Sequence, residues 1–176
     1  MGSIVLSTQM TVDGVITVDE WYVPDGDHDD AARALFEQSS AMLLGRKTYE
    51  GLAGYWPKES GPWADLINPM PKFVASRTLR EPLTWNATLL KGELEDAVAT
   101  LKAEREGDLI TNGCGELTRN LHAAGLVDEF WFSVHPAVWG KGERPFWEEE
   151  KIRLTLLGTE TYDSGVVLLR YEPERA

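Results

Sequence analysis

The chain is poor in cysteine and in positive charge, and it contains no long hydrophobic run. Cys114 is the single cysteine among 176 residues, so an intrachain disulfide and a zinc site built from several cysteines are both excluded. One cysteine is typical of a protein kept in a reducing compartment, and we therefore expect a cytoplasmic location. The N-terminal residues Met1–Leu6 lack the basic region and the long apolar core of a signal peptide.

Acidic side chains outnumber basic ones by 29 to 17, which gives a formal net charge of −12 at pH 7. Proteins that bind nucleic acid need a basic field, because the release of counterions from phosphates drives their affinity. Peripheral membrane proteins need basic or amphipathic segments, and a membrane span needs roughly 20 apolar residues. The sequence therefore argues against nucleic acid and membrane as partners and favours a small-molecule substrate.

The residues that are present suit one domain over residues 1–176. Hydrophobic residues make up 43% of the chain, enough for a sizeable core. The seven tryptophans predict flat apolar pockets or interfaces.

The order of the expected elements indicates an α/β chain. Strands alternate with helices at first and follow one another later, which is typical of a mainly parallel sheet with an antiparallel C-terminal edge. A helix is expected after the acidic loop 17–27, and Gly51 and Gly54 are expected to end the next one. Residues 55–71 are expected to form a loop or flap. The expected strands are 3–9, 41–44, 72–76, 109–111, 130–138, 152–161 and 166–171.

Three junctions between a strand and a helix carry residues suited to binding an anion, at the strand ends where open α/β sheets bind ligands. Gly45–Thr48 combines two cations with the N–H groups of a helix start. Ser76–Thr78 places two hydroxyls around a guanidinium. Asn112–Gly115 contains two glycines that let the backbone approach a ligand closely. Each junction has a plainer interpretation as solvated surface, as an ion pair between Arg77 and a carboxylate, or as a tight turn.

Taken in order, the motifs resemble those of a known family. They are Asp-Gly-Val-Ile at 13–16, Leu-Gly-Arg-Lys-Thr-Tyr-Glu at 44–50, Val-Ala-Ser-Arg-Thr at 74–78, Asn-Gly-Cys-Gly-Glu-Leu at 112–117 and His-Pro-Ala-Val-Trp-Gly-Lys-Gly at 135–142. Over about Ser3 to Tyr171 the chain resembles the dihydrofolate reductase superfamily, and specifically stand-alone relatives of the reductase domain of riboflavin-biosynthesis deaminase/reductase proteins. The resemblance implies a dihydrofolate reductase-like three-layer α/β/α fold and an expected homodimer.

The resemblance also implies NADPH as the cofactor and no metal. Residues 46–48 would hold phosphates of its adenosine half, and residues 76–78 would meet the 2′-phosphate. Residues 112–117 would line the pyrophosphate, and residues 15–17 would flank the nicotinamide. The cofactor residues implied in this way are Val15, Ile16, Thr17, Gly45, Arg46, Lys47, Thr48, Ser76, Arg77, Thr78, Asn112, Gly113, Cys114, Gly115, Glu116 and Leu117.

The acidic loop supplies the candidate catalytic residue. Dihydrofolate reductases keep one carboxylate at this helix start, and Asp29 fits that place, with a role in holding or relaying a proton. The alternative is that it only stabilises the helix start, as acidic residues there commonly do. Asp27, Trp21, Tyr22 and Trp56 are the candidate substrate-binding residues, and Trp63 could line the same pocket. The aromatic residues could equally cover the core.

The resemblance implies an NADPH-dependent reductase that transfers a hydride to a C=N or C=O carbon. Its substrate would be a small pterin-like, pyrimidine-like or sugar-linked molecule, as for a 5-amino-6-(5-phosphoribosylamino)uracil reductase. The riboflavin-pathway reductases usually carry lysine or arginine where this chain has Val15, which weakens the case for that phosphorylated substrate. The alternative function is a non-catalytic nucleotide-binding module or sensor on the same fold.

Overall fold

The chain folds around one mixed β-sheet. The structure, a computed structural model, describes residues 2–113, 115–145 and 151–174. Its strands are β1 (Ile4–Thr11), β2 (Ser39–Gly45), β3 (Lys72–Ala75), β4 (Ala87–Leu89), β5 (Asp108–Asn112), β6 (Glu129–His135), β7 (Leu154–Thr161) and β8 (Val167–Pro173). Its helices are α1 (Asp27–Gln38), α2 (Arg46–Tyr55), the 3₁₀ helix η1 (Trp56–Lys58), α3 (Pro62–Ile67), α4 (Leu94–Glu104) and α5 (Glu116–Ala123). None of these helices is long and apolar enough to cross a membrane.

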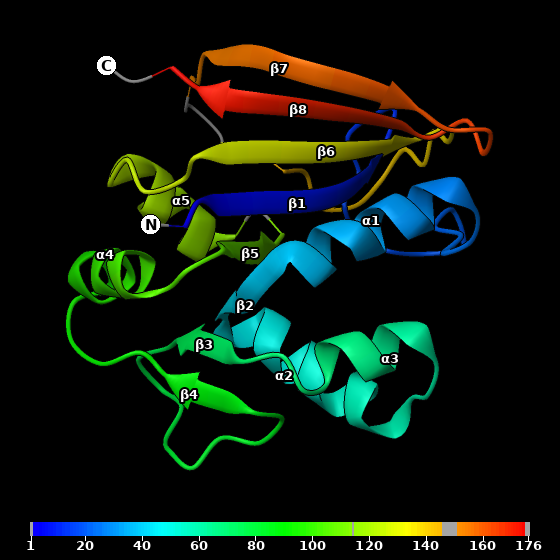
Figure 1. Cartoon of the computed structure of the whole chain (residues 1–176). Coiled ribbons are helices and arrows are strands. Elements are labelled where there is room, and N and C mark those ends of the chain that lie inside the picture. Colours follow the sequence, from blue (N-terminus) through cyan, green and yellow to red (C-terminus); the bar gives the residue numbers. More distant parts are fainter. Residues whose placement is uncertain (1, 114, 146–150, 175–176) are drawn as a thin grey trace.

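The sheet has eight strands in the order β4-β3-β2-β5-β1-β6-β8-β7 (Figure 1). All pairs from β4 to β6 are parallel, whereas β8 pairs antiparallel with both β6 and β7. This confirms the predicted α/β class with an antiparallel C-terminal edge. Because the parallel strands point the same way, the three junctions singled out in the sequence lie along one edge of the sheet.

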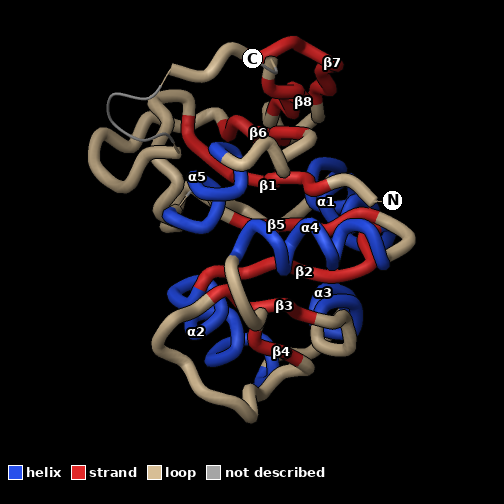
Figure 2. Tube along the Cα trace, turned by 90° about the vertical axis from the view of Figure 1, so that its left-hand side faces the viewer, coloured by secondary structure: helices blue, strands red, loops and turns tan. Residues whose placement is uncertain are grey.

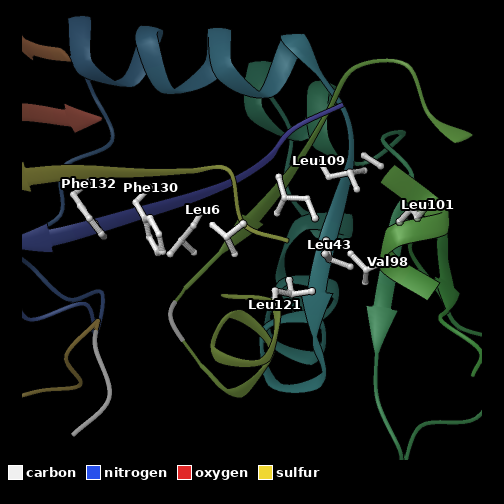
Figure 3. Packing of buried hydrophobic residues seen from close by; sticks show 11 residues of the cluster. Leu6, Leu43, Val98, Leu101, Leu109, Leu121, Phe130 and Phe132 are labelled. Atoms are coloured by element: carbon white, nitrogen blue, oxygen red, sulfur yellow. The ribbon is translucent and has the colours of Figure 1, made fainter. Parts of the chain in front are cut away.

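Alternate residues of the central strands point to opposite faces of the sheet, as the period of two requires. Ile4 and Leu6 of β1 join a buried cluster that contains Val98 of α4 and Leu121 of α5, and Figure 3 shows the packing of this face. Val5, between them, joins a second cluster on the other face with residues of α1, α2 and α3. The helices therefore form a layer on each face. β7 and β8 stand clear of the helices (Figure 2).

The predicted end of the second helix is wrong. Gly51 and Gly54 lie inside α2, which continues to Tyr55. Both glycines are exposed, and a glycine in an exposed helix interior costs only about 1 kcal/mol relative to alanine. The packing of the buried Tyr49 side chain against the sheet outweighs this weak local preference.

The prediction of a loop or flap over residues 55–71 is also wrong, because this segment contains η1 and α3. Pro57 and Pro62 lie in the first turns of these two helices, where the missing N–H of proline has no helical partner to lose. The same residue type therefore starts helices here instead of breaking them. At the other end of the chain, the strand predicted over 130–138 stops at His135, directly before Pro136.

Lys72 of β3 is a buried cation. The residue is 1% exposed, and its Nζ donates to the carbonyl oxygens of Ile67 and Asn68. The same Nζ lies 4.0 Å from the centroid of the Trp85 ring. The ammonium therefore satisfies carbonyls at the end of α3 and ties this helix to the sheet. Burial lowers the pKa of Lys72 to about 8.

Lys72 is expected to make the free energy of unfolding rise with pH between about 8 and 10.5. In this window the unfolded chain keeps a lysine proton that the folded chain releases, so rising pH favours the folded state. Below pH 8 both states hold the proton and this contribution is constant. Chemical denaturation of the wild type and of Lys72→Met, below pH 8 and near pH 10, measures the effect. The stability difference between the two should shift in favour of the wild type at the higher pH, and parallel pH profiles would contradict the assignment.

Candidate functional site

A cleft of about 1000 Å³ opens at the carboxyl ends of β2 and β3, beside the starts of α4 and α5. We call it the arginine cleft, after Arg46 and Arg77. Its lining residues are Arg46, Ala75, Ser76, Arg77, Thr78, Gly92, Glu93, Leu94, Glu95, Asp96, Glu116, Leu117 and Asn120. The fold thus brings together six of the predicted cofactor residues: four from the first two junctions and two, Glu116 and Leu117, from the helix that follows the third.

Each arginine of this cleft already has an acidic neighbour. Arg77 Nη2 lies 3.4 Å from Glu116 Oε1, and both side chains are exposed. Arg46 Nη1 lies 3.5 Å from Glu50 Oε2 on the next turn of α2. Exposed pairs of this kind are worth about 0–1 kcal/mol, so a bound phosphate can replace the carboxylate at little cost. The ion-pair interpretation of Arg77 and the phosphate interpretation are therefore compatible.

The turn after β5 has open space and an unused hydrogen-bond acceptor. A Cβ atom built at Gly113 or at Gly115 would have nothing within 4 Å, and Gly113 has a φ of +81° that favours glycine. Asn112 Oδ1 is buried and has no hydrogen-bond partner among the described residues. A buried acceptor of this kind is costly unless something binds there. These features fit a ligand that carries hydrogen-bond donors and lies against the backbone. Cys114 lies outside the described residues.

The helix starts at this edge keep their N–H groups free of side-chain caps. Gly45 and Gly115 are the cap residues of α2 and α5, and neither helix has a side-chain cap hydrogen bond. The first N–H groups of a helix are then available to an anion. Lys47 and Thr48 lie in the first turn of α2 but are not among the residues that line the arginine cleft.

The segment predicted to flank the nicotinamide is held by hydrogen bonds to residues 137–144, an arrangement that we call the loop clasp. Its centre is Asp13, whose Oδ1 accepts from the backbone N–H of Trp139 at 3.0 Å. Asp13 Oδ2 accepts from the N–H of Gly140 at 2.8 Å, and the Thr11 hydroxyl donates to Oδ1 at 2.6 Å. Hydrogen bonds from Thr11, Trp139 and Gly140, in that order of importance, lower the pKa of Asp13 to about 2.

The loop clasp also fixes the next residues. Val15 is fully buried, and both its N–H and its carbonyl are bonded to Thr11. Ile16 N–H donates to the carbonyl of Glu143 at 2.9 Å, and Glu143 N–H donates to the Thr17 hydroxyl at 2.9 Å. The geometry favours Ile16 and Thr17 as the residues of this segment that would meet a ligand. The buried Val15 would support them from the protein interior.

Asp29 lies in the first turn of α1 and is 9% exposed. Trp63 Nε1 donates to both of its carboxylate oxygens, at 3.0 and 2.9 Å. Burial, and then the charge of Asp29, raise the pKa of Tyr22 to about 12. At neutral pH the Tyr22 hydroxyl therefore keeps its proton near a carboxylate. The structure thus brings Asp29 together with two predicted aromatic residues, Tyr22 and Trp63.

A second cleft, of about 590 Å³, lies near the carboxyl ends of β1 and β6, between the start of α1 and the turn from β7 to β8. We call it the histidine cleft, after His28 and His135. Its lining residues are Trp21, Val23, Asp25, Gly26, Asp27, His28, His135, Pro136, Asp163, Ser164 and Val166. It includes two predicted substrate residues, Trp21 and Asp27.

The carboxylate of Asp27 has a structural role at this cleft. It accepts from the backbone N–H groups of His28 at 3.0 Å and of Asp163 at 2.8 Å. These bonds tie α1 to the turn between β7 and β8, and the one from Asp163 is the main cause of the lowered pKa of Asp27. Trp56 lies elsewhere: its ring packs against Tyr55, with centroids 5.1 Å apart, and it belongs to the periphery of the second buried cluster.

Three features of these sites had not been predicted. The indole N–H of Trp63 bonds to Asp29, although the sequence had indicated only a lining role for this ring. Residues 92–96, which lead into α4 and form its first turn, line the arginine cleft. They lie there because they follow the short strand β4. His28 and His135 lie far apart in the sequence, yet their ring centroids are 5.4 Å apart. The position of His28 between two candidate aspartates was the one available signal.

The strand order, with a mainly parallel sheet and an antiparallel C-terminal edge, and the similarity to two solved structures define a dihydrofolate reductase-like fold. Its two clefts lie at the carboxyl ends of strands, where open α/β sheets bind ligands. The chain belongs to the RibD C-terminal domain family, which matches residues 3–168. The family resemblance predicted from the motifs is thereby confirmed over nearly the whole chain.

Individual relatives agree with this family. The chain is 30% identical to the uncharacterized protein YyaP of Bacillus subtilis (strain 168), over 96% of this chain and 93% of the relative. A protein provisionally named as a riboflavin biosynthesis protein, from Shewanella sp. PV-4, has a similar structure, with a TM-score of 0.79 and 24% identity over 98% and 99% of the two chains. A pyrimidine reductase-like protein from Corynebacterium diphtheriae has a TM-score of 0.72 and 15% identity over 99% and 93%. RibD from Acinetobacter baumannii has a TM-score of 0.68 and 15% identity over 99% of this chain and 59% of its own.

Proposed function

We propose that the protein is an NADPH-dependent reductase of a small heterocyclic substrate. The observation that carries the proposal is the turn after β5, where the buried Asn112 Oδ1 lacks a partner and the open Gly113 and Gly115 leave room for a ligand. This turn lies at the same sheet edge as the two arginines of the arginine cleft. Membership of a family of reductase domains supports the same class of chemistry.

The residues of the chain would divide the binding of NADPH between them. Arg77, with the hydroxyls of Ser76 and Thr78, would hold the 2′-phosphate, because a guanidinium matches phosphate oxygens two at a time. The N–H groups at the starts of α2 and α5 would hold the other phosphates. Ile16 and Thr17, fixed by the loop clasp, would orient the nicotinamide. NADPH, when bound, supplies the hydride.

The Asp29 carboxylate would hold or relay the proton that accompanies reduction of a C=N or C=O group, with Trp63 fixing its orientation. The Tyr22 hydroxyl, whose pKa is raised to about 12, is a weak acid and would act beside it as a hydrogen-bond donor to the substrate. A positioned proton-transfer group contributes about 100- to 10,000-fold to a rate. The names of the structural relatives favour a pyrimidine-like ring as the substrate.

Replacing Arg77 by alanine is expected to weaken NADPH binding by about 10- to 100-fold and to leave NADH binding unchanged, since the lost contact is a charge-assisted one to the 2′-phosphate. Glu116→Gln is expected to strengthen NADPH binding by up to about 5-fold, because Arg77 loses a competing partner. Quenching of tryptophan fluorescence measures both affinities.

Arg80→Ala is the matched control for this experiment, since Arg80 lies three residues away, carries the same charge, and donates to backbone carbonyls. Its NADPH affinity should stay near that of the wild type. An unchanged preference for NADPH in Arg77→Ala would overturn the 2′-phosphate assignment. If neither NADPH nor NADH binds to the wild type at about millimolar concentration, where even weak cofactor binding is visible, the reductase proposal fails.

We also propose that the protein is a homodimer formed through β7. This strand is an edge of the sheet, and Leu156 and Leu157 on it are 53% and 44% exposed. Exposed edge strands with apolar residues are natural sites for pairing with a second chain. Among the described residues no helix lies beside this edge, which leaves room for such a partner (Figure 1).

A further inference from the structure

The histidine cleft has the size and the walls of a site for a flat ring. Its volume, about 590 Å³, lies in the range of small-molecule pockets. Trp21 and His135 meet edge to face with ring centroids 5.1 Å apart, and His28 meets His135 edge to face at 5.4 Å. Pro136 and Val166 complete an apolar lining. Such rigid, flat walls favour an aromatic or heteroaromatic ligand.

Three carboxylates, those of Asp25, Asp27 and Asp163, are among the groups that line this cleft. His28 Nε2 lies 3.0 Å from the carbonyl oxygen of Val23, so this nitrogen carries a hydrogen, because a carbonyl can only accept. The other ring nitrogen of His28, Nδ1, is buried and has no partner in the described part of the chain. A ligand that satisfies the carboxylates must carry several N–H or O–H donors.

The charge of the cleft discriminates between ligands. The residues that line it include three aspartates and no lysine or arginine. His135 adds no positive charge at neutral pH, because burial lowers its pKa to about 4. A phosphate or carboxylate on the ligand would face carboxylates here without a compensating lysine or arginine, which is an unfavourable arrangement.

We propose that the histidine cleft binds a flat ring that carries amino or amidine donors, is neutral or positively charged, and bears no phosphate. The inference rests on the proposed function in one respect, namely that this ring is the molecule to be reduced. Asp29 and Tyr22 are not among the residues that line the histidine cleft, but the Tyr22 ring meets that of His135 at 5.5 Å between centroids, so Tyr22 would be the nearer of the two to the ring. Trp21 links the two regions, since its Nε1 donates to the carbonyl of Thr17 at 2.9 Å. The cleft therefore adjoins the segment that would orient the nicotinamide.

A series of probes with one shape and different charge tests the proposal. Benzamidine, benzamide, benzoate and phenyl phosphate are titrated into the full chain by calorimetry. Benzamidine should bind most tightly, about 5-fold more tightly than benzamide, and the two anions should show no binding at about 10 mM. Equal binding of benzamidine and either anion overturns the proposal, and so does the absence of binding by every probe.

Two isosteric variants locate the binding site. Asp163→Asn removes one exposed carboxylate of the histidine cleft and should weaken benzamidine by about 2- to 5-fold while leaving benzamide unchanged. Asp96→Asn makes the same charge change in the arginine cleft and should alter neither probe. Equal effects of the two variants would mean that benzamidine responds only to net charge, which overturns the site.

The result is separable from the proposed function because NADPH binding is measured on the same samples. If NADPH binds with the expected dependence on Arg77 and the probe series fails, the reductase proposal stands and the substrate inference falls. If the probe series behaves as expected and NADPH does not bind, the histidine cleft is a ligand site but the reductase proposal fails.

Discussion

Replacing Asp29 by asparagine is expected to lower substrate-dependent NADPH oxidation by about 100-fold or more. Asparagine has nearly the same shape, and its carbonyl oxygen can still accept the hydrogen bond that Trp63 Nε1 now donates to the carboxylate. What is lost is the group that can exchange a proton with a substrate. The affinity for NADPH should be unchanged, because Asp29 is not among the residues that line the arginine cleft.

The measurement is a decrease in absorbance at the NADPH band in the presence of candidate ring substrates, with thermal denaturation to establish that each variant is folded. Asp30→Asn is the matched control, since Asp30 lies beside Asp29 in the first turn of α1 but is exposed and paired with Arg33 at 2.8 Å. Its activity should stay within about 2-fold of the wild type, as for other exposed ion pairs. Equal activity of Asp29→Asn and the wild type would remove Asp29 from the mechanism.

Trp63→Phe tests the positioning role of the indole. Phenylalanine keeps an aromatic ring against Phe36, whose centroid lies 5.3 Å from that of Trp63, but it cannot donate to Asp29. We expect a loss of activity of about 10-fold, between those of Asp30→Asn and Asp29→Asn, because a loosely held carboxylate is less often in the productive orientation. The alternative function, a non-catalytic binding module, predicts NADPH binding without any oxidation for the wild type itself.

The sequence predicted those parts of the fold that depend on local patterns. The short apolar runs of β1 and β2 and the glycine-rich turn after β5 can be recognised from consecutive residues, and the structure has strands and a turn at these places. The length of α2 was mispredicted because it depends on Tyr49 packing against the sheet, which outweighs two exposed glycines. β4 was missed because it has only three residues, Ala87–Leu89, and exists through its pairing with β3.

In the candidate sites, too, the sequence predicted what depends on local patterns and missed what depends on packing between elements. Six predicted cofactor residues meet in the arginine cleft because a strand end is recognisable from its own sequence, and parallel strands then align the ends. The contact of Trp63 with Asp29 joins residues 34 positions apart, and that of His135 with His28 joins residues far apart on β6 and α1. Such contacts depend on how elements pack, and a single sequence carries no periodic signal for them. Val15 is an example of what a single sequence does not show. It stands beside Ile16 in the segment predicted to flank the nicotinamide, but its side chain is fully buried.

Replacing Asp13 by alanine is expected to weaken NADPH binding by about 10-fold or more through loss of order in the loop clasp. The Asp13 carboxylate accepts the backbone N–H groups of Trp139 and Gly140 and the hydroxyl of Thr11. Without it, the segment that carries Ile16 and Thr17 must be ordered when the nicotinamide binds, and that cost lowers the affinity. Binding of 2′-phospho-ADP-ribose, which lacks the nicotinamide, should be unaffected.

Asp19→Asn is the matched control for the clasp, because its carboxylate accepts only one, longer bond from residues 137–144, from Trp139 Nε1 at 3.2 Å, besides a local bond from the N–H of Glu20. If Asp13→Ala weakens NADPH and 2′-phospho-ADP-ribose equally, the clasp does not act on the nicotinamide segment and Asp13 is only a stabilising residue.

The clasp also predicts a dependence on acid. The pKa of Asp13 is lowered from 3.8 to about 2 in the folded chain, so between these values the unfolded chain binds the proton and the folded chain does not. The stability that Asp13 contributes is therefore complete above pH 3.8 and is lost as the pH falls towards 2. Denaturant titrations of the wild type and Asp13→Asn should show a stability difference that is constant from neutral pH to about 4 and shrinks below it. A difference that stays constant down to the lowest pH at which both proteins fold would show that the hydrogen bonds of the clasp do not depend on the charge of Asp13.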